Sequence, residues 1–340
     1  MKKNKALIVL LICLFVFGVV TVTYRLLLDE NKLTLTEKKY IQDSKSNLIN
    51  VNVSNNLNVF GLAGKGVFYD FLADFESSRG LNFNKIAVQS DADMSGLSLR
   101  NGDNVPSNAI QMYTDHYVLV GKTFAKIKSI SDISGNIGIL SKSSENISKI
   151  TNQYQLTITN YEDRSSLENA LNTDRVNYIL VPRLEYLDTI LGNLYSIVYH
   201  FTDIKNYYFI TPSNNKYLDS ILKKHFNIWS SENFNNSFNK NEYDIFINKL
   251  KITEKELDVI NRKEYTYGFV NDAPYNIKSS GGFGGIFSEY LKSFSDFSGI
   301  EFKYKNYKNV NKLKEAANKK KIDLYGNLYI FDSDFVESVS

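Results

Sequence analysis

The sequence predicts an α/β protein in which two copies of one module follow a single transmembrane helix. Three observations lead to this prediction. Strand-like and helix-like segments alternate in the order of βαβ units, about 20 residues return 219 positions later (Gly66 and Gly285 mark the two copies), and residues 6–24 form an uncharged apolar run. A repeat with so long a period is a whole domain, because solenoid units have periods of about 20–50 residues.

Length and composition fit two folded domains and exclude several classes of function. A chain of 340 residues has room for about two domains, and 43% apolar residues with 14% aromatics suffice for a core. The 40 basic and 37 acidic residues are mixed along the chain, so no nucleic-acid partner is predicted. Cys13 is the one cysteine and there are three histidines, so neither a disulfide, nor a metal site, nor any cofactor is predicted.

The N-terminus is predicted to be a signal anchor. Residues 1–5 carry three lysines, and the 19 residues of 6–24 would span about 28 Å as a helix, close to the thickness of a bilayer core. The lysines predict a cytoplasmic N-terminus and an extracytoplasmic main part, in a single-pass protein of the cell membrane. A cleaved signal peptide is the alternative, although the run ends without a small-x-small cleavage site.

Each copy opens with a strand, a helix and a second strand. In the first copy a strand is predicted at residues 48–53, and residues 66–79 have the i, i+3, i+4, i+7 apolar spacing of an amphipathic helix that Gly80 ends. Later strands are predicted at residues 136–140, 156–159, 176–181 and 206–211, and helices from 141–145 onward, at 165–173 and at 217–229.

The order of these segments resembles a known family. Tyr267-Gly268-Phe269-Val270, Ala273-Pro274-Tyr275 and residues 285–291 resemble the opening strand, Pro-aromatic loop and first helix of the bacterial extracellular solute-binding proteins of family 3. In the first copy, residues 132–139, 166–178 and 207–210 resemble the same family's entry to its second lobe, the helix and strand of that lobe, and its return strand. The resemblance implies the type II periplasmic binding fold, a two-lobed Venus flytrap that closes on a small ligand.

The resemblance and the repeat together predict the domain organisation. A lead-in in which Thr is followed by Glu, typical of a helix N-terminus, precedes each copy, at residues 35–41 and 252–257. The second copy is expected to be truncated within its first lobe. The predicted parts are a cytoplasmic tail (1–5), an anchor (6–24), a stalk (25–47), a first module (48–250, with lobe 1 about 48–120 and 205–250 and lobe 2 about 125–204) and a truncated second module (251–340).

The family's ligand-clamping residues are only partly present. Amino-acid receptors of this family usually carry an arginine near residues 110–117 and an aspartate after the second-lobe strand, where this chain has no arginine and Val181-Pro182-Arg183, respectively. Ser143 and Ser144 could offer a helix N-terminus to an anion, or could simply cap the helix. At the offset of the repeat, Tyr275 falls opposite Asn56. The candidate ligand-binding residues are Asn56, Tyr113, Thr114, Ser143, Ser144, Arg183, Asp272 and Tyr275.

Tandem modules behind an anchor resemble the ectodomains of membrane sensors. The predicted function is therefore non-enzymatic: a small amino acid, peptide or organic acid binds between two lobes, and closure is passed to a downstream signalling domain, with a homodimer compatible with this arrangement. No catalytic constellation stands out. A binding receptor of a transport system and the non-catalytic part of a cell-wall enzyme are the alternatives.

Overall fold

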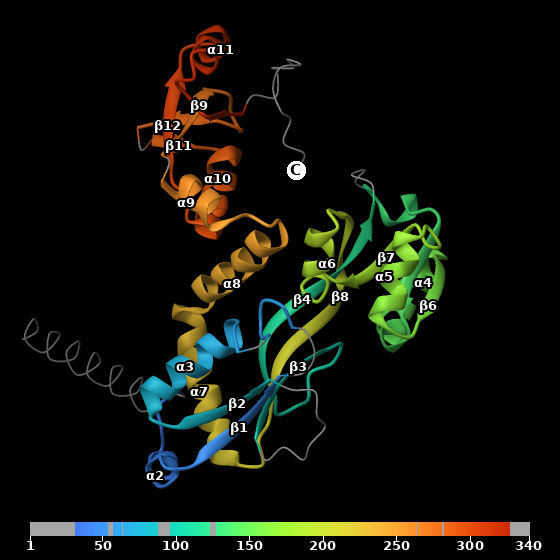
Figure 1. The fold of residues 1–340 in the computed structure, drawn as a ribbon, viewed down its shortest axis with the longest axis vertical. Helices are drawn as coiled ribbons and strands as arrows, with labels where there is room; N and C mark the ends of the chain where they lie inside the picture. Colours follow the sequence, from blue (N-terminus) through green and yellow to red (C-terminus); the bar gives the residue numbers. More distant parts are fainter. Residues whose placement is uncertain are drawn as a thin grey trace, which may run out of the picture. The chain divides into compact units, whose positions relative to one another are not determined.

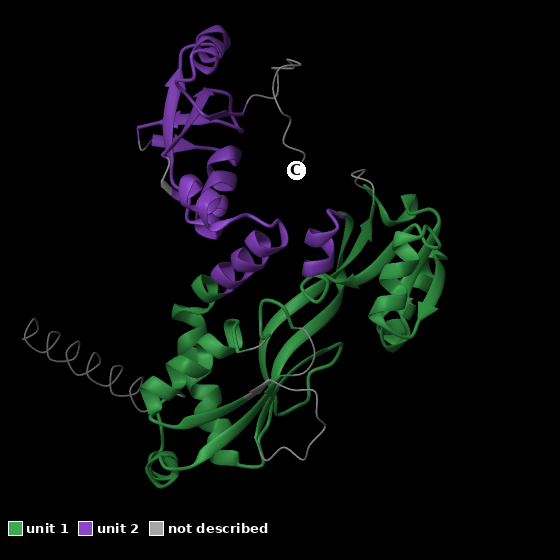
Figure 2. Cartoon of the chain, in the orientation of Figure 1, with its two compact units in different colours: residues 1–187, 196–237 green, residues 188–195, 238–340 purple. Residues whose placement is uncertain are grey.

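The computed structural model describes residues 31–53, 57–62, 64–87, 96–122, 127–262, 264–280 and 282–326. The chain divides into two compact units, residues 1–187 with 196–237 and residues 188–195 with 238–340 (Figure 2). Both units combine helices and strands, so the predicted α/β class is confirmed.

The first unit contains most of the secondary structure (Figure 1). Its elements are α2 (Leu35–Ser44), β1 (Leu48–Val53), α3 (Val67–Arg79), β2 (Asn82–Ala87), β3 (Leu97–Gly102), β4 (Ile110–Gly121), β5 (Asn136–Leu140), α4 (Ser144–Tyr154), β6 (Thr157–Tyr161), α5 (Arg164–Asn172), β7 (Tyr178–Pro182), β8 (Ser196–Thr211) and α7 (Lys216–Glu232). Two short 3₁₀ helices, η1 and η2, cover Ile130–Asp132 and Ser141–Ser143, and the unit boundary falls within α6 (Leu187–Gly192) and α8 (Phe234–Lys249).

Two long strands connect the two lobes of this unit. The sheet order is β2-β1-β3-β8-β4-β7-β5-β6, and antiparallel β4 and β8 pair from Ile110 with Ile210 to Gly121 with Ser196. Strand β3 pairs with one end of β8, and β7 pairs with the opposite end of β4. We call β1–β3 with α3 and α7 the first lobe, and β5–β7 with α4 and α5 the second lobe. Three register shifts interrupt the β4–β8 ladder between them.

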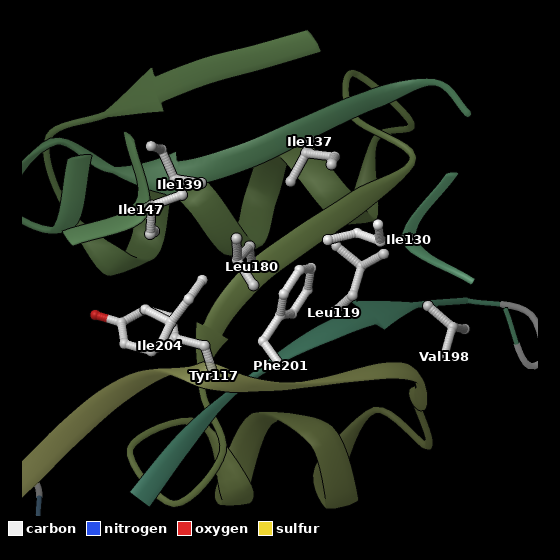
Figure 3. Packing of buried hydrophobic residues seen from close by; sticks show 10 residues of the cluster. All are labelled: Tyr117, Leu119, Ile130, Ile137, Ile139, Ile147, Leu180, Val198, Phe201 and Ile204. Atoms are coloured by element: carbon white, nitrogen blue, oxygen red, sulfur yellow. The ribbon is translucent and has the colours of Figure 1, made fainter. Parts of the chain in front are cut away.

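Each lobe has its own apolar core. The second-lobe cluster gathers side chains from β4, η1, β5, α4, β7 and β8 that point toward one another in Figure 3. It consists of Tyr117, Leu119, Ile130, Ile137, Ile139, Ile147, Leu180, Val198, Phe201 and Ile204. In the first lobe, α3 packs on α7, where the ring of Phe71 lies 5.5 Å from the rings of both Phe226 and Trp229. The apolar stripe predicted for residues 66–79 is therefore the helix face that enters the core.

The second unit is a smaller α/β body. It contains α9 (Glu254–Arg262), β9 (Tyr265–Val270), β10 (Ile277–Ser279), β11 (Gly282–Gly284), α10 (Ile286–Ser298), β12 (Phe302–Tyr307), α11 (Val310–Asn318) and β13 (Leu324–Tyr325). Strands β12, β9 and β13 form a parallel sheet in that order, and β10 and β11 form a hairpin. Its buried core includes Tyr267, Phe269 and Leu291.

The repeat is confirmed in three dimensions. Helices α3 and α10 each have 13 residues, and each is followed by a left-handed glycine, Gly80 with φ 67° or Gly299 with φ 73°. Each is preceded by a glycine with positive φ, Gly66 or Gly285, whose Cβ would come within 2.6 Å of backbone atoms. The lead-ins also match, because Thr34 with Glu37 and Thr253 with Glu256 both form capping boxes.

Most predicted elements are present, with shifts at their ends. The strands predicted at 48–53 and 136–140 match β1 and β5, and the helix predicted at 217–229 lies within α7. The strand predicted at 206–211 is longer, because β8 begins at Ser196 and runs through both lobes. Part of the predicted stalk is the helix α2. Among the described residues no helix is both long and apolar enough to cross a membrane, and the predicted anchor at 6–24 lies outside them.

Candidate ligand-binding groove

A polar groove of about 430 Å³ lies between the lobes of the first unit. The first lobe contributes Asp103 and Asn104 from the turn that follows β3. The second lobe contributes Lys142 from the 3₁₀ turn after β5, with Glu145 and Asn146 from the first turn of α4. A groove lined from both lobes is where a bound molecule can favour the closed state over an open one.

The lining carries more negative than positive charge. The Tyr117 hydroxyl donates to Oδ1 of Asp103 at 2.7 Å, and burial raises the pKa of Asp103 above its usual value. The Lys142 ammonium lies 3.3 Å from Oε1 of Glu185, so its charge is already paired. Because Glu145 is exposed beside them, the groove favours a ligand with a cationic or hydrogen-bond-donating group.

Direct hydrogen bonds also join the two lobes. Nδ2 of Asn58, in the loop after β1, donates to the carbonyl oxygens of Leu184 at 2.8 Å and Glu185 at 3.0 Å. Nδ2 of Asn101 donates to Oε2 of Glu185 at 3.0 Å. These side chains therefore link the first lobe to the segment that follows β7.

A buried carboxyl group supports the same loop. Oδ2 of Asp115 on β4 accepts a hydrogen bond from the Leu184 amide at 2.8 Å. Asp115 is almost fully buried, and this burial raises its pKa to about 6, against the opposing effects of the Leu184 amide and of the Arg183 charge. The loop after β7 is thus fixed by two side chains, Asp115 on β4 and Asn58 in the first lobe.

The residues predicted from sequence are dispersed, and few reach the groove. Ser143 lies closest, with Oγ 3.1 Å from the Tyr117 hydroxyl, next to the lining residue Lys142. The Ser144 hydroxyl donates to the carbonyl of Ser141 at 2.8 Å, and Ser143, the N-cap residue of α4, forms no side-chain capping bond. Thr114 Oγ1 accepts from Gln111 Nε2 at 2.8 Å on β4.

The other predicted residues have structural contacts. The Tyr113 ring lies 6.0 Å from the ring of Phe234 and 5.5 Å from that of Phe60. The Arg183 amide donates to the His116 carbonyl at 3.1 Å. Asn56 lies outside the described residues, and Asp272 and Tyr275 belong to the second unit, where the Tyr275 amide donates to the Asp272 carbonyl at 2.9 Å.

The pairing of Tyr275 with Asn56 is wrong. The Phe68 amide donates to the Phe60 carbonyl at 3.0 Å, and the Phe287 amide, at the matching position of the second helix, donates to the Tyr275 carbonyl at 3.1 Å. Phe60 is therefore the counterpart of Tyr275. It is fully buried and stacks on Tyr208 at 4.3 Å, so it cannot serve as a ligand-stacking aromatic in this arrangement.

Sequence reasoning missed the lining residues themselves. The polar turn Asn101-Gly102-Asp103-Asn104 separates two strands, and this turn signal could have drawn attention to Asp103. Lys142 and Glu145 flank the predicted serines, but nothing in one sequence shows which side of a helix start faces the other lobe. Among the described residues, no group of three or more His, Cys, Asp or Glu could hold a metal ion.

Comparison with known proteins identifies the fold. No family model and no curated protein matches the chain. Among solved structures, the periplasmic domain of BvgS from Bordetella pertussis aligns over 86% of this chain and 63% of its own, less than two thirds, with 12% identity and a TM-score of 0.50. This match shows the two-lobed fold of a Venus flytrap that the resemblance implies.

Single Venus flytrap domains align with a smaller part of this chain. The BvgS VFT2 domain from the same organism covers 62% of this chain and 98% of its own, with 13% identity and a TM-score of 0.49. An amino acid ABC transporter substrate-binding protein, AbpA from Streptococcus pneumoniae, in complex with L-arginine, also covers 62% and 98%, with 12% identity and a TM-score of 0.44. The match to the BvgS periplasmic domain, at a TM-score of 0.50, confirms at the level of fold the resemblance to periplasmic binding proteins that the sequence suggests.

Proposed function

We propose that this chain is the extracytoplasmic region of a membrane-anchored sensor, and that its first Venus flytrap module binds a small polar molecule between its lobes. The groove lined from both lobes by Asp103, Asn104, Lys142, Glu145 and Asn146 is the observation that carries the proposal. Residues 48–250 are proposed as this module, residues 251–340 as part of a second, and residues 6–24 as the anchor. The non-enzymatic prediction agrees with the binding domains that the solved neighbours contain.

The charge of the groove narrows the class of ligand. Two carboxylates and one already paired ammonium line it, so an organic acid would meet net repulsion, whereas an amino acid or small peptide can present its ammonium group to Asp103 and Glu145. The AbpA structure contains L-arginine, which fits this chemistry. The groove thus favours amines over anions, although the clamping arginine of amino-acid receptors is absent from the sequence near residues 110–117.

The tandem arrangement favours a sensor over a transport receptor. The same lead-in, helix and flanking glycines occur in both units, and this supports the proposal that two modules of one kind are linked in one chain. A free transport receptor needs one such module. In a sensor, closure of the first module would be passed along the chain to the second and then to an output domain.

A ligand screen by thermal shift and calorimetry on the full chain tests the proposal. We expect binding of amino acids or dipeptides, weakened at least about tenfold by Asp103→Asn with Glu145→Gln and unchanged in Glu232→Gln, an exposed carboxylate outside the groove. No binding of any amine would refute the ligand class. Binding that is indifferent to the double substitution would refute the groove as the site.

A further inference from the structure

Helix α10 of the second unit carries an exposed apolar stripe. Ile286, Tyr290 and Phe294 follow one another at a spacing of four residues, which places them on one face of the helix. Their exposed fractions are 55%, 61% and 38%. Three large apolar side chains in a row on one face indicate a surface that normally packs against something.

The first unit shows what covers the matching face of its own helix. The repeat aligns the stripe with Val67, Phe71 and Phe75 of α3, and all three are completely buried. The covering element is α7, whose Phe226 and Trp229 rings contact Phe71. The same helix face is therefore core in one unit and surface in the other.

A second pair of matching helices, α2 and α9, gives independent evidence that an α7-like helix is missing from the described surface of the second unit. In the first unit, the Glu37 carboxylate of α2 accepts from the Ser220 hydroxyl at 2.6 Å and from the Lys224 ammonium at 2.9 Å, both on α7. Its counterpart on α9 is Glu256, which forms the same capping box with Thr253 but is exposed. One carboxylate has a cationic partner on a covering helix, and the other faces solvent.

A groove adjoins Glu256 on α9. It has a volume of about 530 Å³, and its lining includes the apolar side chains of Leu250, Ile252, Val259 and Ile260. Val259 is 69% exposed, and its counterpart in the repeat is Tyr40. The Tyr40 ring lies 6.1 Å from the ring of Tyr217, again on α7. The groove therefore lies at the position that matches the α7 contact, and its lining combines apolar side chains with Glu256 and two lysines, Lys251 and Lys255.

We propose that the α9 groove and the α10 stripe together form a docking surface for one amphipathic helix with the pattern of α7. Such a helix places a basic residue against Glu256, as Lys224 is placed against Glu37, and aromatic residues against the stripe of Ile286, Tyr290 and Phe294. The reason is that α7 contacts both matching surfaces in the first unit. In the first unit a helix lies on the two surfaces that match these in the repeat, so we expect a helix, and neither a strand nor a membrane, to bind here.

A peptide with the sequence of residues 214–233 is the probe, because it contains α7. Isolated helices of this length are marginal in water, so a covalent staple should join positions 223 and 227, both exposed in α7. Fluorescence anisotropy of the labelled peptide with the full chain should give saturable binding. Tyr290→Lys should weaken binding at least about tenfold, whereas Tyr304→Lys, an exposed aromatic on β12, should not.

A double-substitution cycle tests the register. Glu256→Gln keeps the capping box but removes the charge, and it should weaken binding about fivefold, as should Lys224→Gln in the peptide. The two changes together should cost little more than either alone, because they remove one ion pair. Additive losses, no binding of the stapled peptide, or equal binding by Tyr290→Lys would overturn the proposal. A concentration-dependent dimer that Tyr290→Lys abolishes would also overturn it, in favour of a second copy as the occupant.

Discussion

The Glu37→Gln substitution should destabilise the first unit by about 3 kcal/mol at neutral pH. The Glu37 side chain is 5% exposed and its partner Lys224 is 18% exposed, so this is not a surface ion pair. Although burial opposes ionisation, hydrogen bonds from Ser220, Lys224 and Thr34 lower the pKa of Glu37 from 4.5 to about 2. Each unit of pKa difference between folded and unfolded states corresponds to about 1.4 kcal/mol, which gives the magnitude.

The sign of the pH dependence follows from the lowered pKa. The folded state holds Glu37 ionised down to about pH 2, whereas the unfolded chain protonates it near pH 4.5. The contribution is therefore complete above about pH 5 and declines as the pH falls. The difference between the wild type and Glu37→Gln should shrink from about 3 kcal/mol at pH 7 to about 1.5 kcal/mol at pH 3.

Urea unfolding followed by tryptophan fluorescence measures this difference. Trp229 is the single tryptophan of the chain and lies buried on α7, so its emission reports on the helix that Glu37 contacts. Glu232→Gln on the same helix is the matched control and should change the free energy of unfolding by less than about 0.5 kcal/mol. A loss below about 1 kcal/mol in Glu37→Gln, or a loss that is constant from pH 7 to pH 3, would refute the reasoning.

Three further predictions concern the lobes and the helix start. Burial raises the pKa of Asp115 to about 6, so the wild type should lose stability as the pH rises from about 4 to 6 and this carboxyl group ionises. Asp115→Asn should abolish that decline, measured in the same urea experiment. Asn58→Ala should cost about 1–3 kcal/mol, because it removes two hydrogen bonds to carbonyls that also accept from the Leu187 amide and the Arg164 guanidinium, and it should speed hydrogen exchange at the Leu184 amide; unchanged exchange there would contradict the inter-lobe role. Gly66→Ala should unfold the first unit, because its Cβ meets backbone at 2.6 Å, whereas Gly80→Ala, with 3.8 Å to the nearest side chain, should cost about 1 kcal/mol in melting experiments.

The regular elements could be predicted because their burial is periodic. The spacing of Phe68, Phe71, Leu72 and Phe75 predicts a helix with one buried face, and all four are fully buried. The long extension of β8 was not predicted. Buried and exposed side chains alternate irregularly along the first half of β8, because the register shifts against β4 change which side chains face the core.

The groove could not be predicted, because it depends on two turns that are distant in sequence. Asp103 follows β3 and Glu145 begins α4, and only the long β4–β8 pair brings the two lobes that carry them together. The charge of each residue is evident in the sequence, but its neighbours are not. The same holds for Asn58, whose acceptors at Leu184 and Glu185 lie 126 and 127 residues away.

A fixed offset aligns helices better than it aligns loops, and this explains the displaced partner of Tyr275. Packing fixes the lengths of α3 and α10, whereas the connection before each helix is free to vary. A single bridge between Leu62 and Lys65 precedes α3, but the β10–β11 hairpin precedes α10 and shifts the preceding loop by four residues. Phe60 and Tyr275 therefore share a backbone role while one is core and the other is half-buried. The counterpart of a binding residue in the other module is found from the backbone hydrogen bond to the helix start. The residue count alone leads from Tyr275 to Asn56.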